Sequence, residues 1–309
     1  MHSVSIVGCG YTGSRLARRF RSMGASVCGF ASRAASLEQV AAAGAKALPL
    51  NLDSALAPLD LAGQLVYYSV PPAPHRTGDG RSDDPSDDQS DPRLARFLDS
   101  LDRAPLRPAA PARLIYLSTT GVYGDQYGAK VSEETLPAPK TARAIRRLEA
   151  ENTVRRWAQA RSVSWCILRV SGIYGPGRLP LERLRRGEPA IAPEEATPSN
   201  RIHVEDLVTA CVAAGVSKHA DQRIYNVTDG SDDSLTAYLQ RVARIAELPP
   251  PPLISRAEAL RTFTESSRSF LGESRRVENR RLLEELGIAL AYHDLDSGIR
   301  ASLCTPAMQ

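Results

Sequence analysis

The chain has 309 residues, of which 42% are hydrophobic and 24% are charged, and its formal net charge is +4. These values are ordinary for a globular protein, and the length allows one large α/β domain with an appendage or two domains. No apolar run reaches the roughly 18 residues that a membrane-spanning helix needs. The chain enters its first predicted strand at once, so we expect neither a membrane partner nor a signal peptide.

The cysteines and the basic residues restrict the setting further. Five cysteines are scattered without a Cys-x-x-Cys pair, which is typical of reduced thiols in a cytoplasmic protein. Four of the 39 basic residues are lysine, so arginine dominates, but the charge is not clustered with aromatic residues, which make up 6% of the chain. A nucleic-acid-binding surface combines both features, so we expect no nucleic-acid partner.

The first predicted strand, residues 4–7, leads through Gly8-Cys9-Gly10-Tyr11-Thr12-Gly13 into a helix with apolar residues at helical spacing. This order of strand, glycine turn and helix favours a dinucleotide-binding loop over a glycine-rich turn without a ligand. Gly8 permits the tight turn, Gly10 leaves room for a pyrophosphate, and Gly13 lets the helix pack close to the strand. The backbone N–H groups at Tyr11 and Thr12 then point at the anion.

The end of the second predicted strand, residues 25–30, indicates the cofactor. NAD-preferring sites place a carboxylate there for the ribose 2′-hydroxyl, whereas this chain continues with Ser32 and Arg33. A hydroxyl and a guanidinium would bind a 2′-phosphate, so the pattern favours NADP, with NAD possible; the alternative is a surface arginine. After the third strand, residues 47–50, either Asn51 or Asp53 could face the adenine.

The fourth predicted strand, residues 65–70, ends with Ser69 and Val70, which we expect to contact the cofactor because ligands bind at the carboxyl ends of such strands. Residues 75–92 contain six aspartates and few apolar residues. We interpret them as a mobile loop, with a solvated insertion favoured over a lid. A metal site there is not expected, because a disordered loop does not preorganise its ligands.

Further strands at residues 113–117 and 164–169, separated by a helix over about 141–159, predict an α/β fold with a doubly wound parallel sheet. From residue 171 the chain changes to shorter elements. They comprise helices over 181–186, 234–247 and 275–286, a further helix into which residues 201–206 lead and which ends at 215, an irregular stretch over 189–200, and a strand over 224–227. Gly287 is expected to cap the last helix.

Several stretches together resemble the extended short-chain dehydrogenase/reductases, also called the NAD-dependent epimerase/dehydratase family. They are the glycine turn and residues 118–125, 168–178, 201–206 and 225–229. The G-x-G-x-x-G spacing of the glycine turn is similar to that of atypical members of this family. The resemblance implies a Rossmann domain over 1–170 and a small C-terminal substrate-binding region over 171–309, with 201–230 returning to the sheet. It implies a small-molecule substrate, possibly nucleotide-linked or phosphorylated, and a monomer or homodimer.

The catalytic set of the family is present only in part. Thr119, with Ser118 beside it, aligns with the hydroxyl that holds the substrate oxygen. The family's Tyr-x-x-x-Lys pair falls on Arg143 and Arg147. Arginine does not deprotonate in proteins, so Arg143 cannot act as the base. Arg143 could instead orient an anionic substrate or stabilise an oxyanion, and Arg147 could hydrogen-bond the nicotinamide ribose.

Another group must then move the proton. Tyr123 is the best candidate near in sequence, with Tyr127, Lys130, Glu133 or water as alternatives. Tyrosine is also a common packing residue, and packing in the Val-Tyr-Gly turn is the competing interpretation of Tyr123.

Arg178 and Arg201 flank the expected substrate cleft and could hold a phosphate or carboxylate, or lie on the surface. His203 precedes a helix and is interpreted as fixing that junction. Two functions follow: an NADP-dependent oxidoreductase or epimerase without the usual Tyr-Lys pair, or a non-catalytic NADP-binding sensor. A module without a ligand conflicts with the complete glycine turn.

Overall fold

The computed structural model describes residues 3–73, 90–104, 110–264, 268 and 272–304. Within these residues, a seven-stranded parallel sheet has the order β11-β7-β5-β4-β1-β2-β3. From β1 to β3 each new strand is added toward one edge of the sheet, and from β4 to β11 toward the other edge. This is the doubly wound Rossmann arrangement that was predicted. The bounds are β1 (Ser3–Val7), β2 (Ser26–Ala31), β3 (Lys46–Pro49), β4 (Leu65–Tyr68), β5 (Arg113–Thr119), β7 (Ser164–Val170) and β11 (Arg223–Val227).

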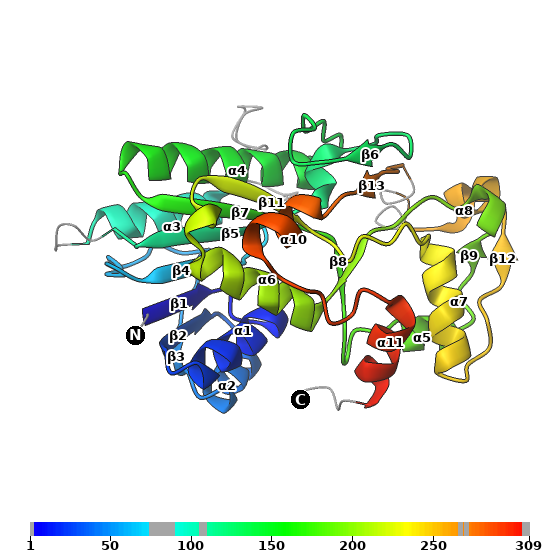
Figure 1. The fold of residues 1–309 in the computed structure, drawn as a ribbon, viewed down its shortest axis with the longest axis horizontal. Coiled ribbons are helices and arrows are strands. Elements are labelled where there is room, and N and C mark those ends of the chain that lie inside the picture. The colour runs from blue at the N-terminus through cyan, green and yellow to red at the C-terminus, as the bar shows by residue number, and fades with distance from the viewer. Residues whose placement is uncertain (1–2, 74–89, 105–109, 265–267, 269–271, 305–309) are drawn as a thin grey trace.

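Helices cover both faces of this sheet (Figure 1). One face packs against α1 (Tyr11–Ser22), α2 (Ala34–Ala42), α6 (Val204–Val216) and α10 (Arg280–Leu286), and the other against α3 (Pro92–Asp102) and α4 (Ala142–Ala160). Side chains of a strand alternate between the two faces. In β4, Leu65 and Tyr67 therefore enter the α1–α6 core, whereas Val66 and Tyr68 enter the α3–α4 core.

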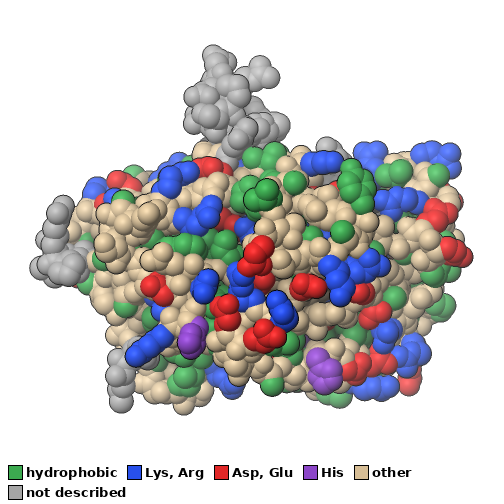
Figure 2. All heavy atoms as spheres, turned by 45° about the horizontal axis from the view of Figure 1, so that its top comes forward, with side chains coloured by type: hydrophobic (Ala, Val, Ile, Leu, Met, Phe, Trp, Pro, Cys, Tyr) green, Lys and Arg blue, Asp and Glu red, His purple; other side chains and the backbone are tan. Residues whose placement is uncertain are grey.

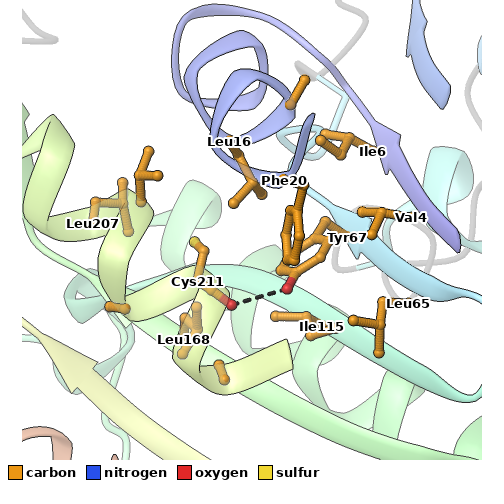
Figure 3. Close-up of a cluster of buried hydrophobic side chains, with 14 of the residues drawn as sticks. Val4, Ile6, Leu16, Phe20, Leu65, Tyr67, Ile115, Leu168, Leu207 and Cys211 are labelled. Carbon is orange, nitrogen blue, oxygen red and sulfur yellow. Dashed lines mark hydrogen bonds between the residues drawn. The ribbon is translucent and has the colours of Figure 1, made fainter. Parts of the chain in front are cut away.

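Tyr67 joins three elements in the first of these cores (Figure 3). Its ring lies 5.7 Å from the ring of Phe20 on α1, and its hydroxyl donates a 2.9 Å hydrogen bond to the Cys211 carbonyl on α6. A Cβ atom at Gly215 would lie 2.0 Å from the same hydroxyl, so glycine is required at that close approach. These contacts hold α6 beside α1 and thereby support the glycine turn at the start of α1.

A second, smaller lobe lies at one end of the sheet and contains a core of its own (Figure 1). It includes α5 (Leu181–Arg185), α7 (Leu235–Ile245), α8 (Arg256–Thr262), α11 (Leu295–Cys304) and the strands β9 (Ala190–Ile191) and β12 (Leu253–Ile254). Two short parallel pairs complete the fold: β8 (Gly172–Tyr174) with β10 (Arg201–His203), and β6 (Lys130–Val131) with β13 (Arg276–Val277). Strand β11 pairs with β7 in the main sheet. The division near residue 170 stays a prediction.

Two parts of the chain differ from the predicted elements. Helix α3 was not predicted, although Asp91 accepts from the N–H groups of Arg93 and Leu94 and Pro92 occupies the first turn, which are common helix-start signals. The tail was predicted to hold one helix beginning at residue 275, but α10 begins at Arg280 because residues 276–277 pair with β6, and α8 and α11 are additional. Residues 75–89 of the polar loop predicted over 75–92 lie outside the described residues.

Figure 2 shows Lys and Arg side chains interspersed with Asp and Glu over the visible face. All five cysteines are unpaired, as was expected. In the described part of the chain, no helix is both long and apolar enough to cross a bilayer.

Candidate cofactor and substrate site

The three glycines of the turn have different surroundings. Gly8 has a φ of +85°, and a Cβ atom there would lie 2.7 Å from the Val70 side chain. At Gly13 a Cβ atom would lie 3.1 Å from Ile6 and 3.2 Å from the Cys9 sulfur. At Gly10, which precedes α1, the nearest atom would be 4.0 Å away. The protein itself excludes a side chain at Gly8 and would crowd one at Gly13, whereas Gly10 borders open space.

A cavity of about 350 Å³ opens beside this turn, at the carboxyl ends of β1, β2, β3 and β4. Many of the predicted cofactor residues line it: Gly8, Gly10, Ser32, Arg33, Asp53, Ser69 and Val70. The other three, Tyr11, Thr12 and Gly13, lie in the first turn of α1. Both Asn51 and Asp53 line the cavity, so the choice between them for the adenine stays open.

Arg93 also lines this cavity and was not predicted from the sequence. Its Nε and Nη2 atoms each lie 2.7 Å from one carboxylate oxygen of Asp53. The signal that would have found it is the helix start at Asp91 and Pro92, which places an arginine in the first turn of α3.

Tyr11 connects the glycine turn with the loop after β8. Its ring lies between the guanidinium groups of Arg15 and Arg178, each 4.0 Å from the ring centre. Its hydroxyl donates a 3.0 Å hydrogen bond to the Pro176 carbonyl. Arg15 also forms a 3.4 Å ion pair with Glu205 on α6. The exposed Arg178 is thereby held next to the first residue of α1.

Ser118 and Thr119 are adjacent in sequence but point in different directions, because neighbouring residues of a strand face opposite sides. Thr119 is half-buried, and its hydroxyl oxygen accepts from the Gly121 N–H at 3.2 Å. Ser118 is buried and donates to Glu151 on α4 at 2.5 Å. Glu151 forms a buried ion pair with Arg169 at 2.8 Å. This arrangement ties Ser118 to a structural network instead of the substrate position that was expected for it.

Tyr123 is completely buried, and its hydroxyl donates to the Asn226 side chain at 2.7 Å. The Arg169 guanidinium lies over its ring at 4.8 Å. Burial raises the pKa of the Tyr123 hydroxyl. The structure therefore gives Tyr123 the packing role that competed with proton transfer in the sequence interpretation.

Arg147 reaches the carboxyl ends of two central strands from α4. Its Nη1 atom lies 3.0 Å from the Tyr116 hydroxyl, 3.2 Å from the Leu117 carbonyl and 3.5 Å from the Val70 carbonyl. Arg143 lies one helical turn earlier, and residues four apart share a helix face. Val70, whose carbonyl Arg147 contacts, also lines the cavity, so Arg147 lies at the edge of the cavity where β4 ends.

Arg201 and His203 belong to the junction between the sheet and the second lobe. Arg201 is 6% exposed, stacks on the Tyr238 ring at 4.1 Å and donates to the Ser199 carbonyl at 2.6 Å. The buried His203 accepts from the Glu205 N–H and contacts the Ser302 hydroxyl at 3.3 Å. Burial, with the charge of Arg15, lowers the pKa of His203 to about 4, so it is a neutral anchor for α6 and α11.

A model of the NAD-dependent epimerase/dehydratase family matches residues 4–228. A solved structure described as a functionally unknown conserved protein from Silicibacter pomeroyi DSS has a TM-score of 0.82 and 30% identity, with 100% of each chain covered. Among curated proteins, none matches the chain.

Two further solved structures resemble the fold at lower identity. UDP-glucuronic acid 4-epimerase from Bacillus cereus, in complex with UDP-glucuronic acid and NAD, has a TM-score of 0.72 and 17% identity, with 97% of each chain covered. dTDP-glucose 4,6-dehydratase from Bacillus anthracis, in complex with NAD, has a TM-score of 0.72 and 13% identity, with 98% of this chain and 96% of that chain covered.

Proposed function

The chain belongs to the NAD-dependent epimerase/dehydratase family, and on that premise we propose that it is an NADP-dependent oxidoreductase or epimerase for a carbonyl or nucleotide-sugar-like substrate. It works without the Tyr-x-x-x-Lys pair of its relatives. The observation that carries the proposal is the cavity beside Gly10, which leads from the glycine turn to the exposed Arg33. We place the protein in the cytoplasm because its cysteines are unpaired.

The choice of NADP rests on the residues after β2. Ser32 and Arg33 are both exposed and line the cavity where NAD-binding sites carry a carboxylate. A guanidinium binds a phosphate through charge-assisted hydrogen bonds. The structures of the two enzymes compared above contain NAD. The preference for NADP is therefore our proposal for this chain and is not taken from those enzymes.

The reacting end lies where β4 and β5 end. A bound nicotinamide dinucleotide would supply hydride transfer there. Thr119 would hold the substrate oxygen, Arg147 would hydrogen-bond the ribose next to the nicotinamide, and Arg143 would stabilise developing negative charge. Because neither arginine releases a proton and Tyr123 is buried, water supplies or accepts the proton.

The substrate class rests on positive charge beside the glycine turn and at the junction with the second lobe. Arg178 is exposed, is held beside the glycine turn by Tyr11, and can form a bidentate pair with a phosphate or carboxylate. Arg201 is buried against Tyr238 in the second lobe and offers a second cation of the same kind. UDP-glucuronic acid, which the Bacillus cereus enzyme binds, contains both anionic groups and is the first substrate to test.

A second candidate function is a non-catalytic NADP-binding protein that reports cofactor state to a partner. The observation that favours it is the pair Arg143 and Arg147 in place of the family's tyrosine and lysine, since neither can act as a general base. The cofactor cavity would serve both functions, so only turnover separates them.

Calorimetric titration of nucleotide-free protein with NADPH and NADH tests the shared premise. Tight NADPH binding with weaker NADH binding would support the proposal, and no binding of either would overturn it. UDP-glucuronic acid and UDP-glucose would then be incubated with the loaded protein. Chromatography monitors conversion of the sugar. Conversion favours the enzyme, and binding without conversion of these substrates favours the sensor.

A further inference from the structure

The cofactor cavity contains three charged side chains among the described residues that line it: Arg33, Asp53 and Arg93. Asp53 supplies a carboxylate to a space that we assign to an anionic cofactor. Its two oxygens each accept from Arg93, through Nε and Nη2, at 2.7 Å. This is the bidentate arrangement in which arginine pairs most strongly with a carboxylate.

Local structure fixes both partners of this pair. Asp53 follows β3 in a short turn, in which its N–H donates to the Asn51 side chain at 3.0 Å. Arg93 lies in the first turn of α3, where Asp91 caps the helix, and its Nη1 atom lies 3.4 Å from the Pro71 carbonyl. Its side chain is 20% exposed, compared with 55% for Asp53. The hydrogen bonds that Arg93 donates to the Asp53 carboxylate raise the pKa of Arg93, so the guanidinium stays charged.

The pair changes how the cavity responds to a phosphate. A phosphate monoester carries a charge of about −2 near neutral pH. An isolated carboxylate in the same cavity would repel it, and the repulsion is stronger in a partly enclosed space than in water. With Asp53 neutralised by Arg93, the positive charge of Arg33 remains as the net charge of the described lining.

We propose that Arg93 is a specificity-determining residue that sets the preference for NADP over NAD by neutralising Asp53. It acts through Asp53 and does not need to touch the phosphate. This inference rests on the proposed cofactor function, in which Arg33 is the residue that binds the 2′-phosphate directly.

The test compares the dissociation constants for NADPH and NADH in matched variants. Arg93→Gln should raise the constant for NADPH roughly five- to tenfold and that for NADH less than twofold. Arg103→Gln is the control, because Arg103 directly follows the last residue of the same helix and pairs with Asp99 outside the cavity. It should leave both constants unchanged.

Removing the carboxylate distinguishes neutralisation from direct contact. The double variant Asp53→Asn/Arg93→Gln should regain the NADPH preference of the wild type, and Asp53→Asn alone should keep it. Equal weakening of NADPH and NADH binding by Arg93→Gln would overturn the inference. Failure of the added Asp53→Asn substitution to restore the NADPH preference in the double variant would overturn it as well. If Arg93→Gln does not fold, the Asp53→Asn variant alone is measured. Loss of its NADPH preference contradicts the inference, and retention supports it. Absence of NADPH binding in the wild type would instead refute the cofactor function itself.

Discussion

The hydroxyl of Tyr11 donates a 3.0 Å hydrogen bond to the backbone carbonyl of Pro176, which lies 165 residues further along the chain. The bond connects the first residue of α1 with the loop that leads into the second lobe. The approach is close, since a Cβ atom at Gly175 would lie 2.7 Å from the same hydroxyl. The glycine turn and this loop are therefore positioned together, and the exposed Arg178 lies over the Tyr11 ring.

Replacing Tyr11 with phenylalanine tests this connection. The ring would keep its place between Arg15 and Arg178, but the hydrogen bond to Pro176 would be lost. We expect the free energy of unfolding to fall by about 1 kcal/mol, the usual net contribution of one such bond. Urea unfolding measures it. Tyr127→Phe is the control, because Tyr127 is 84% exposed; a similar loss in both variants would contradict the prediction.

Arg33→Ala tests the assigned cofactor. Loss of a charge-assisted hydrogen bond to a phosphate costs roughly 1.5–3 kcal/mol, or about tenfold or more in affinity. We expect this loss for NADPH and little change for NADH, measured by calorimetry. Arg18→Ala, which removes an exposed arginine of α1, should affect neither nucleotide. Equal losses of NADPH and NADH in Arg33→Ala would refute the assignment.

Thr119→Ala tests the position of the active site. If the Thr119 hydroxyl holds the substrate oxygen, its removal should lower kcat roughly 100-fold, as removal of one stabilising donor does in other enzymes. The NADPH dissociation constant should stay within about twofold of the wild type, and Thr119→Ser should retain most of the activity. Full turnover by Thr119→Ala on a substrate that the wild type converts would mean that the chemistry lies elsewhere.

The buried His203 makes the stability of the protein depend on pH. Its pKa in the folded state is about 4, below the ordinary value of 6.5. As the pH falls below 6.5, the unfolded chain takes up a proton that the folded chain does not, so stability decreases until the pH reaches about 4. We expect His203→Gln to lose about 2 kcal/mol less than the wild type between pH 7 and pH 4.5. Parallel stability profiles in urea unfolding would show that His203 is not held neutral.

The sequence alone predicted the features that depend on neighbouring residues. The glycine turn, the alternating strands and helices and the parallel sheet follow from local spacing, and so does the left-handed Gly287, with a φ of +62°, at the end of α10. The start of α3 carries a local signal of the same kind in Asp91 and Pro92, although this helix was not predicted. These features are predictable because hydrogen bonds and turns between nearby residues determine them.

Only the tertiary structure decided how side chains from distant segments meet. The pairing of Arg93 with Asp53 joins residues 40 positions apart. Ser118 turns to Glu151 on α4, and Tyr123 is buried against Asn226 on β11. Sequence spacing places these residues near a strand end, but their orientation depends on which face of the sheet each helix covers and on the register of β5, β7 and β11. Those choices come from packing of the whole core, so the sequence alone proposed the candidate site, and the packing determined how its side chains are oriented.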